Sequence, residues 1–216
     1  MKLNAINYKY KTKNMLRLRF LLIFCVGCVI NLMSQEVANS TTDVPIEKNI
    51  ATPAVSAKAA RSLSRHIDNI SKKFKEKGLD VKAVRDGQVV LVTIPASDLF
   101  APNETRLKAG AETILAYFKQ AVEHPQSYRL VVAVYADDTG DEDYSTELTM
   151  ERAESVTKGL QRTANVKNDD MNIDSYWFGN SRFVVPNNSV INRAKNRRVE
   201  IYIVPEQYII DASRSS

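Results

Sequence analysis

The chain alternates between stretches whose apolar residues recur every three or four positions and stretches rich in β-branched residues. The first kind is typical of amphipathic helices and the second of strands. Three helices are predicted, the first within residues 58–80, the second from Leu107 to Val122 and the third over about residues 146–162. The apolar positions of the first helix are Leu63, Ile67, Ile70 and Phe74, with Gly78 as its stop.

The β-branched stretches predict five strands. Two of them form a hairpin over residues 81–95, because an Asp-Gly pair at 86–87 separates two β-branched runs. The other three are expected over residues 130–135, 173–178 and 199–203. Strands that alternate with helices over residues 81–205 predict an α/β (α+β) domain, with two main helices on one face of a mixed sheet. The helix at 58–80 precedes this domain as an extra element.

Two stretches lack any such period. Residues 35–57 are small and polar and contain two prolines, so they predict a flexible linker. Residues 206–216 are interpreted as a C-terminal tail.

The positive charge of the chain is concentrated at its N-terminus. The formal net charge is +5, which by itself would suggest a nucleic acid or an acidic surface as partner. Residues 1–34 hold six of the 30 basic residues and no acidic one, which leaves 24 basic against 25 acidic residues and a net charge of −1. No nucleic-acid partner is therefore expected, although Arg193, Lys195, Arg197 and Arg198 lie close together.

The same N-terminal residues predict a secretory signal peptide over residues 1–34. A basic stretch leads into an apolar run of about eleven residues, which is shorter than the roughly 18–20 residues of a membrane span. Ser34 offers a small residue for cleavage. Met15 is an alternative start to Met1, since it leaves a more compact basic region.

The two cysteines, Cys25 and Cys28, both lie in the apolar run. Cleavage after residue 34 would therefore leave no cysteine for a disulfide, a thiolate metal site or a nucleophile. In the alternative, the chain carries a lipoprotein signal that ends at Gly27, and Cys28 is lipidated.

A charged residue stands on the apolar stripe of the third predicted helix. Arg152 shares the four-residue spacing of Leu148, Val156 and Leu160, so it is expected to face the sheet or the edge of that stripe. An unpaired buried charge is very costly. Two interpretations follow, an internal ion pair with the acidic loop after residue 136 or a polar cleft that takes a ligand.

The segments Val134–Gly140 (VYADDTG) and Leu148–Val156 (LTMERAESV) resemble the OmpA-like peptidoglycan-binding domain family. The family pattern runs G-H-T-D-x-T-G and then N-x-x-L-S-x-x-R-A-x-x-V, and the 15-residue spacing between Asp137 and Arg152 is the family's spacing. The resemblance covers roughly residues 88–204. The sequence departs from the pattern at Val134, Tyr135, Ala136 and Ser145, where the family usually has Gly, His, Thr and Asn.

This resemblance implies a two-layer OmpA-like sandwich that binds the diaminopimelate residue of the peptidoglycan stem. The far end of that residue carries an ammonium and a carboxylate on one carbon, so its receptor needs an anion and a cation close together. Asp137 would take the ammonium, and Arg152 would take the carboxylate with a bidentate fork. Supporting hydrogen bonds would come from Asn103, Thr139, Arg197 and, more weakly, Ser145.

The implied function is non-enzymatic anchoring of the outer membrane or an envelope complex to the cell wall. The protein is expected to be exported to the periplasm and associated there with the outer membrane or the wall. The alternative is an envelope protein-interaction or structural domain of the same fold that has lost peptidoglycan binding, as the four departures suggest. Outer-membrane or envelope proteins are further expected partners through the N-terminal helix.

No enzyme, cofactor or metal site is predicted. His66 and His124 stand in unlike contexts, which supports neither a zinc site nor a histidine-based triad. The triplet Asp138-Thr139-Gly140 matches aspartic proteases, but the next residue is Asp141 rather than Ser or Ala, and that fold needs a second aspartate. The acidic loop is also weighed as a calcium site, but it lacks the alternate ligand spacing.

Overall fold

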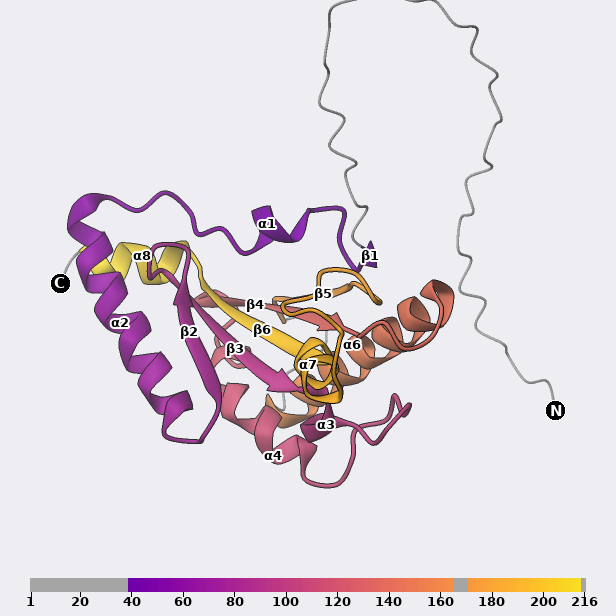
Figure 1. Ribbon diagram of the computed structural model, residues 1–216. Coiled ribbons are helices and arrows are strands. Elements are labelled where there is room, and N and C mark those ends of the chain that lie inside the picture. Colours follow the sequence, from indigo (N-terminus) through magenta and orange to yellow (C-terminus); the bar gives the residue numbers. More distant parts are fainter. Residues whose placement is uncertain (1–38, 165–170, 215–216) are drawn as a thin grey trace, which may run out of the picture. The chain divides into compact units, whose positions relative to one another are not determined.

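A computed structural model describes residues 39–164 and 171–214 of the chain; the predicted signal peptide lies outside these residues. In the described part, six strands form one mixed sheet in the order β1-β5-β4-β6-β3-β2 (Figure 1). The parallel pair is β4 with β5, and the other neighbouring pairs are antiparallel. The strands are β1 Asn39–Ser40, β2 Asp80–Val84, β3 Val89–Pro95, β4 Tyr128–Tyr135, β5 Ile173–Trp177 and β6 Arg198–Pro205.

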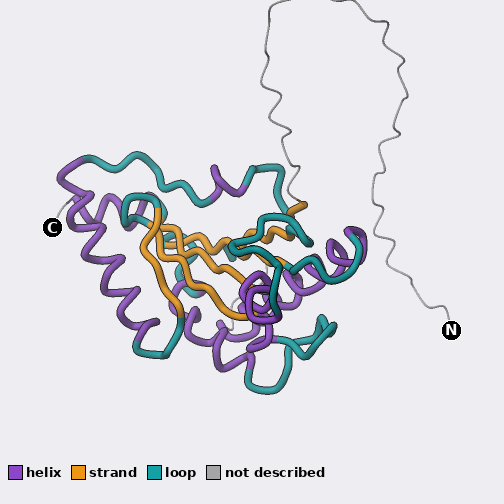
Figure 2. Tube along the Cα trace, in the orientation of Figure 1, coloured by secondary structure: helices purple, strands orange, loops and turns teal. Residues whose placement is uncertain are grey.

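The longer helices, α2, α6 and α8, lie on one face of this sheet (Figures 1 and 2). The helical segment α4-η1-α5 and the long helix α6 share one apolar core with α2 and α8, which confirms the predicted α/β fold with its two main helices on the same face. The helices are α1 Ile46–Asn49, α2 Ala57–Lys75, α3 Ala96–Leu99, α4 Ala111–Leu115, α5 Lys119–Val122, α6 Glu142–Ala164, α7 Val190–Asn196 and α8 Gln207–Arg214, with the 3-10 turn η1 Ala116–Phe118.

The two faces of the sheet divide the residues of the central strands between two cores. On β4, Leu130, Val132 and Val134 pack against the helices, while Val131 and Ala133 belong to a second cluster on the other face. Successive side chains of a strand point to opposite faces, so this division follows from the strand period. Because both faces are covered, β4 reads in the sequence as a continuous apolar run rather than as an alternating one.

The predicted hairpin and the predicted start of the second helix depend on the backbone conformation of particular residues. Asp86 and Gly87 both have positive φ angles, of 57° and 78°, in the turn between β2 and β3. The second helix begins at Ala111 and not at Leu107, because Gly110 before it has a left-handed φ of 87°. Leu107 instead pairs with Phe100 in an isolated β-bridge.

Residues 39–55, called the strap below, correct the linker predicted over 35–57. The strap pairs with the edge strand β5 through β1 and then crosses the sheet face opposite the helices (Figure 1). Ile46 is 3% exposed within the second core, and Asn49 donates hydrogen bonds to Tyr176 Oη and Asp174 Oδ2, both at 2.8 Å. Arg129 of β4 donates to the Asn49 carbonyl at 2.8 Å. These partners lie 80 or more residues from Asn49 in the sequence, so no local sequence pattern predicts the contacts.

The predicted tail also needs correction, and the N-terminal helix is part of the domain. Residues 207–214 form α8, and its Ile210 is fully buried against α2 in the helix-side core. The apolar face of α2 is covered by the domain itself, since Leu63 and Ile67 are fully buried and Phe74 is 6% exposed. That face is therefore not free to dock an envelope protein. None of the described helices is long and apolar enough to cross a membrane.

Candidate functional site

Asp137 lies just after β4, where the loop meets the residue that precedes β6. The register pairs Tyr135 of β4 with Arg198 of β6, which brings Arg197 beside this loop. The Asp137 carboxylate is buried, with 4% of its side chain exposed, and Arg197 Nη1 donates a hydrogen bond to Oδ2. Thr139 N–H donates to Oδ1 at 3.0 Å. The anion of the predicted site is thus held on two sides, and one of its partners is a cation.

Glycines shape the loop that carries Asp137. Gly140 has a φ of 102°, a conformation that L side chains rarely adopt, and a Cβ there would lie 3.0 Å from the ring of Tyr144. Ala136 N–H donates to the Gly179 carbonyl at 2.7 Å, and Gly179 N–H donates to Thr149 Oγ1 of α6 at 3.0 Å. The loop and α6 are therefore connected through the turn that follows β5.

Arg152 is buried on α6, at 4% exposure, as its position on the apolar stripe predicts. Its Nε donates to the Glu104 carbonyl at 2.9 Å, and its guanidinium lies 4.9 Å from the centre of the Phe100 ring. A longer contact of 3.5 Å joins Nη2 to the Ala101 carbonyl. Arg152 therefore fastens the 100–104 loop to α6.

The internal ion pair weighed for Arg152 is not observed. Among the described residues, no carboxylate lies within ion-pair distance of Arg152, and its Nη1 makes no hydrogen bond. Burial lowers the pKa of Arg152; Tyr144 acts to raise this pKa and Arg197 to lower it. Arg152 and Arg197 are thus within electrostatic reach of each other, and Asp137 is hydrogen-bonded to Arg197.

The remaining predicted residues fall into three settings. Asn103 is exposed, has a positive φ of 58° and lies between the two residues whose carbonyls accept from Arg152. Thr139 is exposed and joined to Asp137 through its backbone. Ser145 is 1% exposed, and its buried Oγ has no hydrogen-bond partner among the described atoms.

Sequence reasoning missed two residues that build this region. Tyr144 packs over Gly140 and interacts electrostatically with Arg152. Extending the stripe of Arg152 two turns backward would have found it, because positions eight apart lie near one side of a helix. Thr149, fully buried, links α6 to Gly179; Leu148, which was placed on the stripe, is only half-buried.

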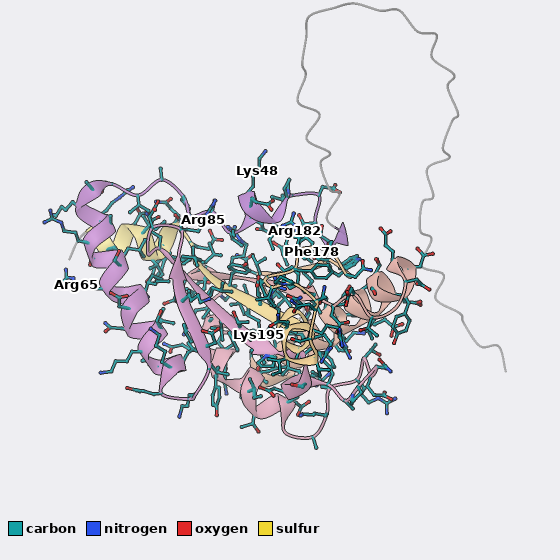
Figure 3. The ribbon with its side chains drawn as sticks, in the orientation of Figure 1. Lys48, Arg65, Arg85, Phe178, Arg182 and Lys195 are labelled. Atoms are coloured by element: carbon teal, nitrogen blue, oxygen red, sulfur yellow. The ribbon has the colours of Figure 1, made fainter. Side chains whose placement is uncertain are left out.

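The departures from the family pattern before Asp137 are packing positions. Val134, Tyr135 and Ala136 are 0%, 3% and 5% exposed. Tyr135 stacks on Phe178 with 4.9 Å between ring centres. The Arg198 guanidinium lies 3.7 Å from the centre of the Tyr135 ring. Arg182 covers the Phe178 ring at 4.3 Å (Figure 3). Burial raises the pKa of Tyr135 well above its ordinary value, and Glu200 raises it further.

The next feature is metal binding, for which the sequence weighed a calcium loop. Across 39–164 and 171–214, no group of three or more His, Cys, Asp or Glu side chains is placed to hold a metal ion.

Comparison with known proteins shows which family this region matches. Residues 99–197 match the model of the OmpA family. The probable lipoprotein YiaD of Escherichia coli K12 is 31% identical over 132 residues, which are 61% of this chain and 58% of YiaD. The match thus spans less than two thirds of that relative's length.

Solved structures share the fold at lower sequence identity. A MotB-like protein of Desulfovibrio vulgaris has a TM-score of 0.55 at 22% identity, over 74% of this chain and 96% of that one. The cell wall anchor of the T6SS from Pseudomonas aeruginosa has a TM-score of 0.52 at 22% identity, over 67% and 97% of the two chains. The periplasmic domain of Helicobacter pylori MotB has a TM-score of 0.51 at 21% identity, over 64% and 88%. The resemblance predicted from the sequence is therefore confirmed over residues 99–197, which match the OmpA family.

Proposed function

We propose that this domain binds peptidoglycan without catalysis, through the diaminopimelate of the peptide stem. It would anchor the outer membrane or an envelope complex to the cell wall. The names of its structural neighbours, a cell wall anchor and the periplasmic domain of MotB, support an envelope setting. So does the predicted signal peptide, with Cys28 lipidation as the alternative that the name of the lipoprotein YiaD favours.

The observation that carries the proposal is the local balance of charge. Two guanidinium groups, of Arg152 and Arg197, lie within electrostatic reach of each other, and one buried carboxylate, Asp137, is bonded to the second. Such a site has an excess of positive charge that a ligand carboxylate would neutralise. Arg152 still has Nη1 free of hydrogen bonds within the described residues, which suits a bidentate fork.

Asp137 retains capacity for the ligand ammonium. An ionised carboxylate offers about four lone-pair positions, and the bonds from Thr139 and Arg197 occupy two. Asn103 and the Thr139 hydroxyl are exposed nearby elements that would complete the hydrogen bonding. Ser145 would assist from beneath the loop, where its hydroxyl is unpartnered.

Four departures from the family pattern suggest a loss of peptidoglycan binding, but their positions in the structure weaken that argument. Val134 packs in the helix-side core, and the Tyr135 ring lies against Phe178 and Arg198, so these two side chains serve packing. The residues that would hold the two charges of diaminopimelate are intact. Ser145 is the remaining departure within the proposed set.

Sedimentation of the purified protein with isolated sacculi tests the proposal. Free meso-diaminopimelate should displace the protein from sacculi, whereas Nα-acetyl-lysine amide, whose one free ammonium has no carboxylate on the same carbon, should not. Losing a hydrogen bond to a charged group costs about 1.5–3 kcal/mol, so Arg152→Lys, without the fork, should weaken binding roughly 10- to 150-fold. Because Arg152 also holds the 100–104 loop, Arg152→Ala is the less selective variant.

Arg162→Ala is the matched control, since Arg162 is an exposed arginine of the same helix that pairs with Glu112. It should bind sacculi as the unmodified protein does. Equal displacement by Nα-acetyl-lysine amide and diaminopimelate would overturn the assignment of the ligand. Failure of the folded protein to bind sacculi at all would favour an envelope interaction domain of the same fold.

A further inference from the structure

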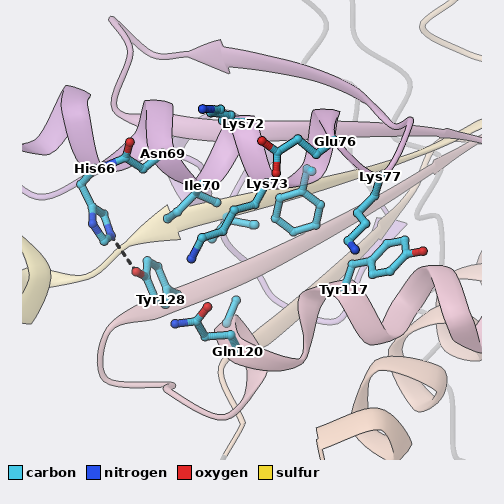
Figure 4. Close-up of a pocket in the computed structure, with 13 residues that line it drawn as sticks. His66, Asn69, Ile70, Lys72, Lys73, Glu76, Lys77, Tyr117, Gln120 and Tyr128 are labelled. Carbon is cyan, nitrogen blue, oxygen red and sulfur yellow. Dashed lines mark hydrogen bonds between the residues drawn. The ribbon is translucent and has the colours of Figure 1, made fainter.

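A recess apart from the candidate site, called the α2–α5 groove below, lies between the C-terminal half of α2 and the η1–α5 segment (Figure 4). Its volume is about 680 Å³, within the ~300–1,000 Å³ typical of small-molecule sites. None of the residues proposed to bind peptidoglycan lines it. The lining residues are His66, Asn69, Ile70, Lys72, Lys73, Phe74, Glu76, Lys77, Tyr117, Gln120, Ala121, Tyr128 and Ile203.

The inner surface of the groove is apolar. Phe74 and Ala121, 6% and 8% exposed, and Ile203, 1% exposed, belong to the helix-side core and reach the groove from α2, α5 and β6. Phe74 is held in place by Phe118, with 4.8 Å between ring centres. Half-buried Ile70 also packs against this core. The recess therefore offers hydrocarbon contact to whatever enters it.

At one end of the groove a histidine and a tyrosine bind each other. His66 Nε2 lies 2.7 Å from Tyr128 Oη, and the two rings are parallel. Burial lowers the pKa of His66, and the neighbouring Lys73 lowers it further. An imidazole that is neutral at pH 7 leaves the lysines as the charges of this recess.

The rim is cationic. Lys73 reaches from α2, and Lys77 from the turn that follows it, across the groove towards Gln120 and Tyr117 (Figure 4). Lys77 Nζ lies 5.6 Å from the centre of the Tyr117 ring. Lys72 adds a third ammonium, against the single carboxylate of Glu76. No ion pair joins any of the three lysines to a described carboxylate.

We propose that the α2–α5 groove binds an anionic amphiphile, a molecule with one acidic head and a hydrocarbon or aromatic body. The head would lie against Lys73 and Lys77, and the body against Ile70, Phe74 and Ala121. Unpaired ammonium groups above an apolar floor complement this chemistry, whereas a simple inorganic anion would gain nothing from the floor. Residues 1–34 of the chain, with six basic residues and no acidic one, have the wrong charge to be the occupant.

The competing explanation is that the lysine stems only cover apolar surface while their ammonium groups stay in water. Two probes with a similar aromatic body separate the explanations. The anionic probe is 8-anilino-1-naphthalenesulfonate, and the neutral one is N-phenyl-1-naphthylamine. With the purified protein, the anionic probe should bind at one site per chain and more tightly than the neutral one.

Lysine variants locate the acidic head. Exposed ion pairs contribute about 0.2–1 kcal/mol, so Lys73→Gln and Lys77→Gln should each weaken binding of the anionic probe by about threefold and leave the neutral probe unaffected. Lys75→Gln is the matched control, because Lys75 is an exposed lysine of the same helix that does not line the groove. An equal loss with Lys75→Gln would assign the binding to a diffuse basic surface and overturn the proposal.

A blocked groove tests the apolar part. Ala121→Phe should remove binding of both probes. Gln120→Glu, at an exposed position facing Lys73, should weaken binding of the anionic probe alone, and it provides a test if Ala121→Phe fails to fold. Dodecanoate should then displace the anionic probe at lower concentration than dodecanol does. If folded Ala121→Phe binds both probes as the unmodified protein does, a site in the groove is refuted. The same conclusion holds if probe binding is unchanged and the variant also adsorbs to phosphatidylglycerol vesicles as strongly as the unmodified protein.

Discussion

Arg197 donates a hydrogen bond to the carboxylate of Asp137, so the buried anion of the candidate site already has a cation beside it. The pair joins the loop after β4 to the residue before β6. It gives Arg197 a role that differs from the ligand contact implied by the family resemblance. Here the arginine orients the aspartate and also contributes to the positive field around Arg152.

Removing Arg197 should therefore affect stability as well as binding. A hydrogen bond to a charged group contributes about 1.5–3 kcal/mol, and the 40% exposure of the Arg197 side chain reduces this, so we expect Arg197→Ala to lower the free energy of unfolding by about 1 kcal/mol. Urea unfolding measures this change. In a double-mutant cycle with Asp137→Asn, the two losses should not add. Simple additivity would contradict the pairing, and exposed Lys195→Ala serves as the control.

The stability of the protein should fall as the pH decreases through the titration range of a histidine. Burial, and then Lys73, lowers the pKa of His66 below its ordinary value of 6.5, so the unfolded chain binds a proton more readily than the folded one. The contribution is present above pH 6.5 and is lost as the pH falls from 6.5 towards the lowered pKa.

Urea midpoints at pH 7.5 and pH 5 check this expectation for three proteins. His66→Gln should show a smaller decrease between the two pH values than the unmodified protein. His124→Gln, the variant at the other histidine of the sequence, is the matched control for loss of a histidine. A decrease that His66→Gln leaves unchanged would assign the pH dependence to other groups.

Gly159 of α6 lies directly against the side chains of Leu115 and Leu107. A Cβ there would lie 2.5 Å from Leu115 Cδ1 and 2.7 Å from Leu107 Cδ1. Alanine favours a helix interior by about 1 kcal/mol over glycine, but overpacking a buried position costs about 1–3 kcal/mol. Leu115 is fully buried and has little room to move, so we expect Gly159→Ala to destabilise the protein by about 1 kcal/mol in urea unfolding. A gain in stability would show that Leu115 repacks freely.

The elements that the sequence predicted well are those determined by local pattern. The Asp86-Gly87 hairpin, the long helix around Arg152 and the strand at 198–205 all follow from turn chemistry and from periods of two or 3.6 residues. The sandwich fold was reached through the same elements and the family resemblance. The burial of Arg152 could also be predicted, because the sequence places it on the apolar stripe of its helix.

What escaped prediction depends on contacts between distant segments. Ile46 and Asn49 stand among prolines and polar residues, and only the sheet face behind them makes the strap an ordered element. The pairing of Asp137 with Arg197 joins residues 60 positions apart, and nothing near either residue distinguishes it from an Asp137–Arg152 pair. The shape of the α2–α5 groove likewise requires α2, α5 and β6 together.

The strap should behave as an integral part of the domain. Ile46 is its buried aliphatic anchor, at 3% exposure, and replacing a buried isoleucine with alanine costs about 2–5 kcal/mol. We expect Ile46→Ala to destabilise the protein by about 2 kcal/mol, at the low end because a short surface element relaxes easily. Val44→Ala, two residues earlier and 43% exposed, should change stability by less than about 0.5 kcal/mol.

Trypsin distinguishes global destabilisation from detachment of the strap alone. Lys48 is exposed and points outward from α1 (Figure 3), but cleavage after it requires the strap to leave the sheet. In Ile46→Ala, cleavage after Lys48 should become several-fold faster, while cleavage within the sheet stays slow. An unfolding midpoint and a cleavage rate equal to those of Val44→Ala would contradict an ordered strap, because a true linker has no buried anchor to lose.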